Sequence, residues 1–196
     1  MKYYHIWGWK SKQGFLWYTV GMYYCMQVSP YEEERVIEWV KARVDAALYS
    51  EIFHLTRTMR RKFKGNWNDY VQKLLPGYVF VETGEIEEFH QALRRIPLMT
   101  KLLGRGGEAY SPLNASEETW LSQLKGANGE VAVSFIRIME DGEVKILSGP
   151  LIGLAGQIER INLHKRYAAV AVELMGVKTT VHMGIEIVKP AESEGF

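Results

Sequence analysis

The chain has 196 residues, of which 47% are hydrophobic, and this composition is typical of a globular protein with one domain or two small ones. Its formal net charge of +1 at pH 7 excludes a general attraction to nucleic acid, so any basic surface must be local. The single cysteine, Cys25, excludes an intramolecular disulfide framework, and no apolar run reaches the roughly 18 residues of a membrane span, so we expect a cytoplasmic protein.

The first 21 residues are interpreted as an extension that precedes the fold. They carry three lysines and no acidic residue, without the long apolar segment or the small-residue cleavage site of a secretory signal. Met22 then opens a second plausible start, MYYCMQV. The alternative is an additional edge strand over residues 16–20.

A buried strand over residues 23–28 and a helix over residues 30–49 are predicted next. Ser29 would be the N-cap of this helix, with Pro30 at its first position and Glu32 completing a capping box. The apolar residues that follow recur at helical spacing: Val36, Ile37, Val40, Val44, Ala47 and Leu48.

A basic hairpin or loop is expected between a short strand at residues 52–55 and a strand at residues 76–82. Five basic residues lie between Arg57 and Lys64, and a Gly-Asn turn signal follows them.

Two further helices and a strand complete an α+β sandwich. The second helix is predicted over residues 85–96, where Pro97 stops it. The third is short, capped by Ser116, and ends at Gly126. A strand is expected in the stretch between them, which gives the order βαββαβα.

Short strands separated by Gly or polar turns occupy the rest of the chain, and this pattern is typical of a small β-barrel of about 55 residues. They are predicted at residues 144–147, 157–162, 167–174, 177–183 and 185–188. The expected organisation is an extension (residues 1–21), a first domain (22–126), a linker (127–136), a barrel domain (137–190) and a tail (191–196).

Catalysis has little support in this sequence. Five histidines are scattered without the spacing of metal ligands, and the GRGG stretch at residues 104–107 lacks the continuation of a phosphate-binding loop. Cys25 lies in a predicted strand, where a packed and inert thiol is expected. We therefore predict no enzymatic activity, no cofactor and no metal site.

Two basic clusters are candidates for contact with nucleic acid. Five cations in eight residues repel one another unless water or an anion compensates them, and Phe63 and Trp67 stand nearby to stack on a base or to fill the core. The second cluster surrounds an expected turn of the barrel, where side chains are exposed. A merely solvated surface is the alternative for both. The candidates are Arg57, Arg60, Arg61, Lys62, Lys64, Arg160, His164, Lys165, Arg166 and Lys178.

Residues 74–83, LLPGYVFVET, join a Pro-Gly turn directly to an apolar, aromatic strand. Proline lacks an N–H and fits the start of a strand, and glycine lets the backbone bend. If Leu75 and Tyr78 face outward beside Tyr23, they form an apolar patch of the kind that binds a partner. The alternative is that these side chains are core.

These motifs resemble the NusG family of transcription elongation factors. LPGYVFVE resembles the FPGYV-type motif, and GPLIGLAGQIERINLHKRYAAVAVELMGVKTTVHMGIEIV resembles the KOW motif with its barrel, so the similarity covers about residues 22–190. It implies a NusG N-terminal (NGN) α/β sandwich with an antiparallel sheet, followed by an SH3-like barrel that contains the KOW motif. It also implies an apolar pocket for the clamp helices of RNA polymerase. The pocket positions fall on Tyr23, Leu75 and Tyr78, with Pro76 and Gly77 shaping the approach.

The combination of LLPGYVFVET, IPLMTKLLG and LHKRYAAVAVEL is similar to LoaP, a class of specialised NusG paralogues. The loop GPLIGLAG has aliphatic residues where housekeeping members carry an aromatic pair that contacts Rho or a ribosomal protein. The resemblance implies a monomeric, processive antiterminator that binds RNA polymerase and is recruited to specific operons by structured leader RNA. DNA of the elongation complex is a further candidate partner, and no membrane is involved.

The two basic clusters become RNA-binding candidates under this resemblance. Two alternative functions stay open. One is a general elongation factor that couples polymerase to Rho or to the ribosome. The other is an RNA- or ribosome-binding KOW module without polymerase contact.

Overall fold

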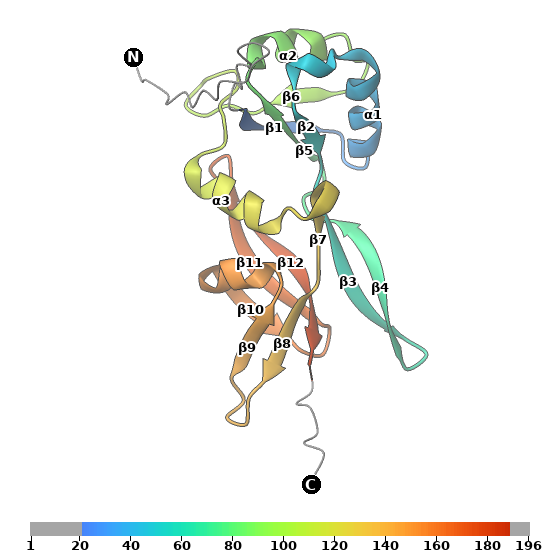
Figure 1. Ribbon diagram of the computed structural model, residues 1–196, viewed down its shortest axis with the longest axis vertical. Coiled ribbons are helices and arrows are strands. Elements are labelled where there is room, and N and C mark those ends of the chain that lie inside the picture. Colours follow the sequence, from blue (N-terminus) through green and yellow to red (C-terminus); the bar gives the residue numbers. More distant parts are fainter. Residues whose placement is uncertain (1–20, 189–196) are drawn as a thin grey trace, which may run out of the picture.

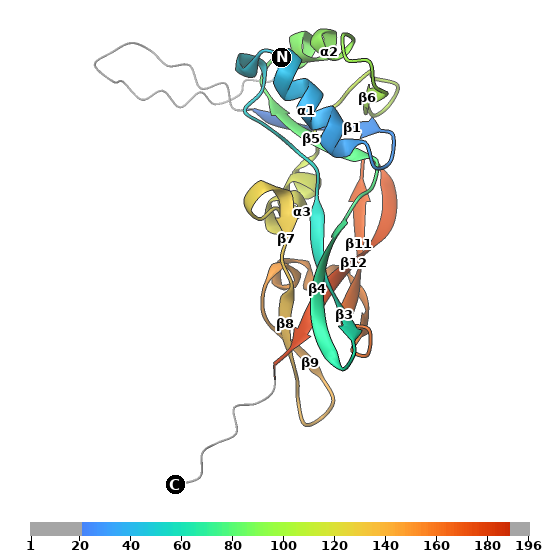
Figure 2. The same cartoon turned by 90° about the vertical axis from the view of Figure 1, so that its right-hand side faces the viewer.

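The computed structural model describes residues 21–188. The extension expected at residues 1–21, with its alternative strand, and the tail expected at residues 191–196 lie outside the described residues, except for Gly21. Within the described part, no helix is long and apolar enough to cross a membrane. An α/β unit lies at one end of the long axis and a β-rich unit at the other, with a hairpin beside the second (Figures 1 and 2).

The α/β unit is built on a four-stranded antiparallel sheet in the order β2-β5-β1-β6. Side chains alternate between the two faces of each strand, so Tyr24 and Met26 lie on one face and Tyr23 and Cys25 on the other. The strands are β1 (Met22–Val28), β2 (Glu51–Phe53), β5 (Tyr78–Thr83) and β6 (Thr100–Leu102).

Helices cover both faces of this sheet. α1 (Glu33–Arg43) and α2 (Ile86–Leu93) pack on the face that carries Tyr24 and Met26. α3 (Ala115–Leu124) packs on the opposite face, where the ring of Trp120 meets that of Phe80 edge-on with centroids 6.4 Å apart. The predicted α+β class is confirmed.

The first helix begins later and ends earlier than predicted. It covers Glu33–Arg43, and a short 3-10 turn, η1 (Ala46–Leu48), follows it. The positive φ of Tyr31 (71°) interrupts the chain between Pro30 and the helix, so Ser29 is not its N-cap. Glu32 holds that position without a side-chain cap hydrogen bond.

The third helix uses a different cap from the predicted one. The Asn114 side chain accepts a hydrogen bond from the Glu117 amide, and the Glu117 carboxylate accepts one from the Asn114 amide. Ser116 lies inside the first turn of the helix. Lys125 is the C-cap, so Gly126 follows the end of the helix as expected.

The predicted basic hairpin is present and is here called the finger, residues 56–73. Its strands β3 (Thr56–Phe63) and β4 (Asn66–Lys73) pair along their whole length, and Lys64 and Gly65 form the turn. After η2 (Ala127–Gly129), β7 (Glu130–Val131) pairs in parallel with the base of β3. The segment expected as a linker is therefore tied to the finger, and the domain boundaries stay a prediction.

The β-rich unit, here called the barrel, is a curled five-stranded sheet in the order β10-β11-β12-β8-β9. The loop GPLIGLAG forms a 3-10 segment, η3 (Pro150–Gln157). The strands predicted at residues 177–183 and 185–188 form a single strand, because the chain stays extended through Gly184. Gly184 lies beside the finger, and a Cβ atom on it would lie 2.3 Å from the Thr58 carbonyl oxygen. The strands are β8 (Ser134–Ile138), β9 (Val144–Ser148), β10 (Ile158–Asn162), β11 (Tyr167–Leu174) and β12 (Val177–Ile187).

One apolar cluster runs from the α/β unit into the barrel. It joins Leu75 and Phe80 with Leu121 of α3 and with Val172 and Val181 of the barrel, all of them buried. α3 lies between the two units (Figure 1). Since buried apolar area contributes roughly 25 cal/mol per Å², this shared cluster holds the units together.

Candidate functional site

The Pro-Gly bend joins the finger to β5. Pro76 is exposed, and Gly77 is buried with a φ of 84°, a conformation that L side chains rarely adopt. The Gly77 carbonyl accepts a hydrogen bond from the Val28 amide (2.9 Å), and the Tyr78 amide donates to the Leu75 carbonyl (3.3 Å). The bend thereby fixes the start of β5 against the end of β1.

A buried carboxylate of α1 holds this bend. Glu33 is fully buried; one of its oxygens accepts a hydrogen bond from the Gly77 amide (2.5 Å), and the other accepts one from the Lys73 ammonium. Burial alone would raise the pKa of Glu33, but the hydrogen bonds from Lys73 and Gly77 outweigh it and lower the pKa below its ordinary value. Glu33 is thus ionised and positions the bend.

The residues predicted to bind polymerase do not form one open patch. Leu75 is buried in the shared apolar cluster, and the half-buried Tyr78 borders a cavity of about 300 Å³ together with Pro76. Val177 and His182 of β12 lie on the barrel side of this cavity. In this arrangement α3 and the barrel together cover the sheet face that would otherwise be apolar surface.

Tyr23 lies apart from that cavity, at the end of α3. Its hydroxyl accepts a hydrogen bond from Lys125 Nζ (3.3 Å), and Lys125 also pairs with Glu51 of β2. The ammonium group lies 4.6 Å from the ring centroid of Phe53, which meets the Tyr23 ring edge-on. Burial raises the pKa of Tyr23, so its hydroxyl stays protonated. The structure therefore separates Tyr23 from Leu75 and Tyr78.

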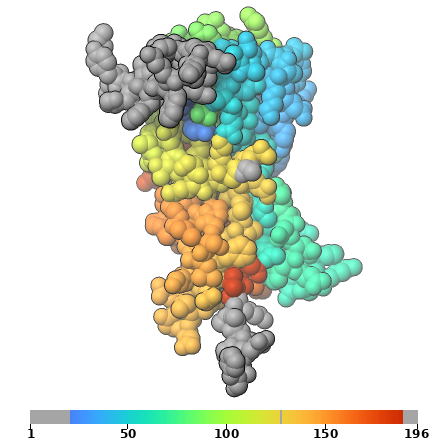
Figure 3. Space-filling view, viewed as in Figure 1, coloured from blue at the N-terminus to red at the C-terminus, as the bar shows by residue number. Residues whose placement is uncertain are grey.

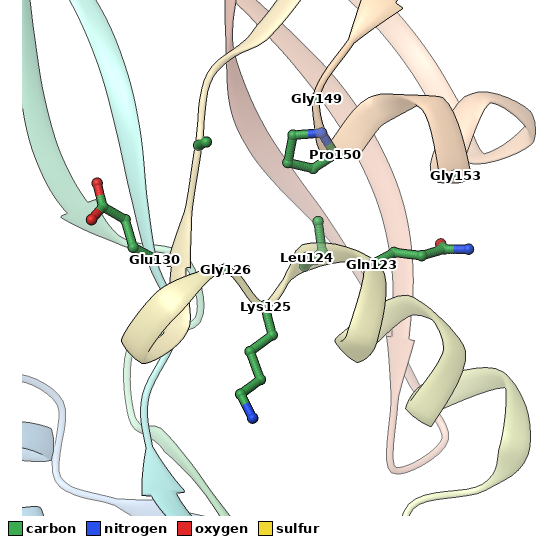
Figure 4. Close-up of a pocket in the computed structure, with 9 residues that line it drawn as sticks. Gln123, Leu124, Lys125, Gly126, Glu130, Gly149, Pro150 and Gly153 are labelled. Carbon is green, nitrogen blue, oxygen red and sulfur yellow. The ribbon is translucent and has the colours of Figure 1, made fainter.

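A further cavity of about 290 Å³ lies between the end of α3 and the start of η3. Figure 4 shows Lys125 pointing away from Pro150, so its ammonium group does not point into this cavity. Gly149 has a φ of 97°, and a Cβ atom there would lie 2.6 Å from Cα of Ser134. The cavity is a seam between α3 and the barrel, without a cluster of reactive groups.

The two basic clusters predicted from the sequence meet in one groove of about 390 Å³, here called the finger–turn groove. One wall is the finger, and the other is the turn between β10 and β11 with the adjacent part of β12. The groove brings together Arg57, Arg60, Arg61, Lys62, His164 and Lys165, and it is also lined by Trp67, Tyr70, Tyr167 and His182.

Two cations of the finger are occupied by contacts with the barrel. Arg57 donates to the His182 carbonyl (2.6 Å), and burial lowers its pKa. Arg60 pairs with Asp69 across the finger (2.7 Å) and with Glu186 of β12. These two side chains therefore fix the finger to the barrel, which is a structural role in addition to the predicted one.

Three other cations of the finger are exposed. Within the described residues, no carboxylate pairs with Arg61, Lys62 or Lys64. The exposed Lys165 on the opposite wall likewise has no acidic partner there. The groove thus holds uncompensated positive charge contributed by both units.

Arg166 is the most enclosed cation of the predicted turn. Its backbone is left-handed (φ 56°), and its guanidinium lies over the ring of Trp67, 5.0 Å from the centroid. Burial and then the nearby charge of Arg60 lower its pKa. Among the described residues, its Nε and Nη1 atoms are buried without a hydrogen-bond partner. Packing the finger on the turn therefore sets like charges together.

Tyr167 and His182 add a pair of stacked rings to the groove. Their centroids are 4.3 Å apart, with 29° between the ring planes. Burial and the charges of Arg57 and Arg160 lower the pKa of His182, so this imidazole is neutral at pH 7. Arg160 itself donates to the Tyr167 hydroxyl (3.0 Å) and lies beside the groove.

Lys178, another residue predicted to bind nucleic acid, lies outside the finger–turn groove. It pairs in register with Glu173 near the turn between β11 and β12. Tyr167, which lines the groove, is at the opposite end of β11. Lys178 is therefore not part of the finger–turn groove.

The described residues include the groups that were considered for catalysis or metal binding. They hold no group of three or more His, Cys, Asp or Glu side chains that could bind a metal ion. Cys25 is fully buried, and burial raises the pKa of its thiol. Arg105 of the GRGG stretch pairs with Glu117.

Glu117 is a contact between the units that sequence reasoning missed. Besides capping α3, its buried carboxylate accepts a hydrogen bond from the Met175 amide in the barrel (2.6 Å). Trp120, one turn later, donates its indole N–H to the Glu173 carbonyl (3.0 Å). The Asn114-to-Glu117 spacing was a signal for the cap, but not for a partner 58 residues away.

The chain is similar in sequence to known proteins of one family. The family model described as "Transcription termination factor nusG" matches residues 21–121. The "Transcription termination/antitermination protein NusG" of Thermus thermophilus is 27% identical over 164 residues, covering 78% of this chain and 89% of the relative. The protein of the same name from Halalkalibacterium halodurans is 26% identical over 172 residues, covering 85% and 93%.

A solved structure shows the same fold. It is described as "Domain interaction in Thermotoga maritima NusG" and superposes with a TM-score of 0.54 at 24% sequence identity. The match covers 84% of this chain and 93% of that one.

Proposed function

Because the chain belongs to the NusG family of transcription termination/antitermination factors, we propose that it is a processive antiterminator of the LoaP class. It binds the clamp helices of RNA polymerase with the α/β unit, and structured leader RNA recruits it to particular operons. This role requires no bond to be made or broken. It also implies a cytoplasmic location, with the polymerase.

The observation that carries this proposal is the Pro-Gly bend and the cavity beside it. Leu75, Pro76 and Tyr78 stand at the start of β5, at one end of the sheet, where the bend and the buried Glu33 fix their position. An apolar surface of this kind suits the side chains of a partner's helices. Tyr23, on the same sheet face, would join the contact once Lys125 releases it.

The barrel must move before polymerase can bind. Leu75 packs in the cluster that continues into the barrel, so this surface is covered in the structure. The apparent affinity for polymerase is then lower than the intrinsic affinity, because only the fraction of molecules in the open arrangement can bind. Polymerase binding is a shift of population toward that arrangement.

The test is a Tyr78→Ala variant assayed with purified polymerase. We expect lost polymerase binding and lost readthrough of a terminator placed behind the leader. Tyr110→Ala is the matched control, because this half-buried tyrosine packs on Tyr24 at the opposite face of the sheet. Unchanged polymerase binding by Tyr78→Ala would refute the proposal and favour a KOW module without polymerase contact.

The general elongation factor of the family is the second candidate, supported by the names of the relatives. In η3, Leu151 and Leu154 are buried, and Ile152 is its exposed large hydrophobic residue. That small apolar tip argues against a contact with Rho or a ribosomal protein of the housekeeping kind. Equal readthrough on templates with and without the leader would favour the general factor.

A further inference from the structure

The finger–turn groove exists because two distant parts of the chain pack together. β3 of the finger lies along β12 of the barrel (Figure 2). In the space-filling view the finger projects from the side of the barrel as a separate lobe (Figure 3). Contacts of Arg57 and Arg60 with β12 hold the finger there, so neither unit forms the groove alone.

The positive charge of the groove favours the binding of an anion with several charges. Arg61 and Lys62 on one wall and Lys165 on the other are exposed, and no described carboxylate pairs with them. Arg166 does not line the groove itself, but its guanidinium lies over the ring of Trp67 and adds positive charge beside it. A polyanion would offset the repulsion that packing creates.

The aromatic rings of the groove favour the binding of flat groups such as unpaired bases. The ring of Trp67 has the Arg166 guanidinium on one side, and Tyr167 and His182 form a stacked pair nearby. Tyr70 is 38% exposed on the finger. Cations interleaved with such rings are the pattern of single-strand binding, in which phosphates meet cations while bases stack on rings.

We infer that the finger–turn groove binds an unpaired stretch of polynucleotide, with phosphates held by cations of both units and bases stacked on the rings between them. This inference rests on the proposed recruitment by nucleic acid and narrows it to the closed arrangement, before the barrel moves to admit polymerase. The ligand is a loop or a single strand, and the barrel turn binds it only in combination with the finger. Nascent RNA and a displaced DNA strand present the same chemistry.

The test measures binding of the full-length protein by fluorescence anisotropy at salt concentrations between about 50 and 200 mM. The probes are a labelled single-stranded RNA of about 12 mixed-sequence nucleotides, the DNA strand of the same sequence, and the corresponding RNA duplex. We expect one strand per protein and weaker binding of the duplex. Polymerase binding of each variant is measured in parallel.

Variants on each wall distinguish polynucleotide binding by the groove from binding by either unit alone. Lys62→Ala and Lys165→Ala should each reduce the slope of log affinity against log salt by about 0.7, the value for one phosphate contact on a single strand. Lys145→Ala is the control, since this exposed lysine of β9 lies outside the groove. Trp67→Ala should weaken binding about 5- to 150-fold, and Trp67→Phe should restore most of it.

Four results would overturn the inference. The first two are no binding of either single strand and equal binding of strand and duplex. The third is loss of polynucleotide binding with Lys165→Ala but not with Lys62→Ala or Trp67→Ala, and the fourth is loss of polymerase binding by the groove variants with polynucleotide binding unchanged. The third outcome would leave RNA binding to the barrel alone, and the last would make the groove a protein interface. Tighter binding of DNA than of RNA would support the groove and instead remove the proposed recruitment by RNA.

Discussion

Replacing Glu33 by alanine tests whether one buried carboxylate holds the Pro-Gly bend. In the structure its two oxygens accept hydrogen bonds from the Gly77 amide and the Lys73 ammonium. The variant leaves the buried Gly77 N–H without an acceptor. It also leaves Lys73 with Glu34 as its remaining partner.

The expected cost follows from these two losses. An unsatisfied buried donor costs about 1–3 kcal/mol. Breaking a fully buried ion pair costs about 3–5 kcal/mol, but Lys73 is 16% exposed and keeps Glu34, so this loss should cost about 1 kcal/mol, as for an exposed pair. We expect a total of about 3 kcal/mol. At about 2–4 °C per kcal/mol for a chain of this size, the melting temperature should fall by about 6–12 °C.

The assay is urea unfolding at pH 7, with the melting temperature as a second measurement. Glu34→Ala is the matched control, because it removes the other carboxylate partner of Lys73 from a side chain that is 56% exposed. An exposed pair contributes about 0–1 kcal/mol, so this control should stay close to the wild type. Polymerase binding should fall for Glu33→Ala by more than the loss of folded protein explains.

Equal stability of the two variants, within about 0.5 kcal/mol, would refute this reasoning. It would mean that the Gly77 amide finds another acceptor or that water reaches Lys73 in the variant. Glu33→Gln gives a second check. It can still accept from Gly77 while losing the charge, so its stability should lie between those of the wild type and Glu33→Ala.

Three other predictions concern pH, the finger and the thiol. The lowered pKa of Glu33 means that its stabilisation is present above the ordinary carboxyl pKa of about 4.3 and is lost as pH falls through the lowered value, so acid unfolding should be steeper for the wild type than for Glu33→Gln. Gly184→Ala should lower the free energy of unfolding by about 1–3 kcal/mol in urea titrations, because its Cβ would meet the Thr58 carbonyl; no loss would show that the finger can shift. A thiol reagent at pH 8 should leave Cys25 unmodified in the folded protein and modify it in urea, and rapid modification without urea would contradict its burial.

Local patterns in the sequence predicted much of the fold. The Arg57–Lys64 cluster with its Gly-Asn turn predicted an exposed hairpin or loop, and the structure has the hairpin, because turn chemistry and strand propensity act over a few residues. Cap positions were less reliable. Ser29 fits the pattern of an N-cap, but the left-handed backbone of Tyr31 delays the helix.

Contacts between distant residues could not be predicted. The sequence left open whether Leu75 is surface or core, since that depends on a barrel that begins about 60 residues later. Glu33 reads as one of several solvated acids at a helix start, and only the folded chain brings Gly77 to it, 44 residues away. The clusters around Arg61 and Lys165 were both predicted as basic, but their meeting in one groove depends on how the units pack.

The apolar cluster shared by the two units has a consequence for experiments that cut the chain. Separating the molecule near residue 130 would strip Leu75, Phe80 and Leu121 of their barrel neighbours and leave them facing water. Fragments with such a face tend to self-associate, and an exposed apolar surface of this kind can bind proteins nonspecifically. Binding measured on an isolated half would therefore need a detergent or salt control before it described the intact molecule.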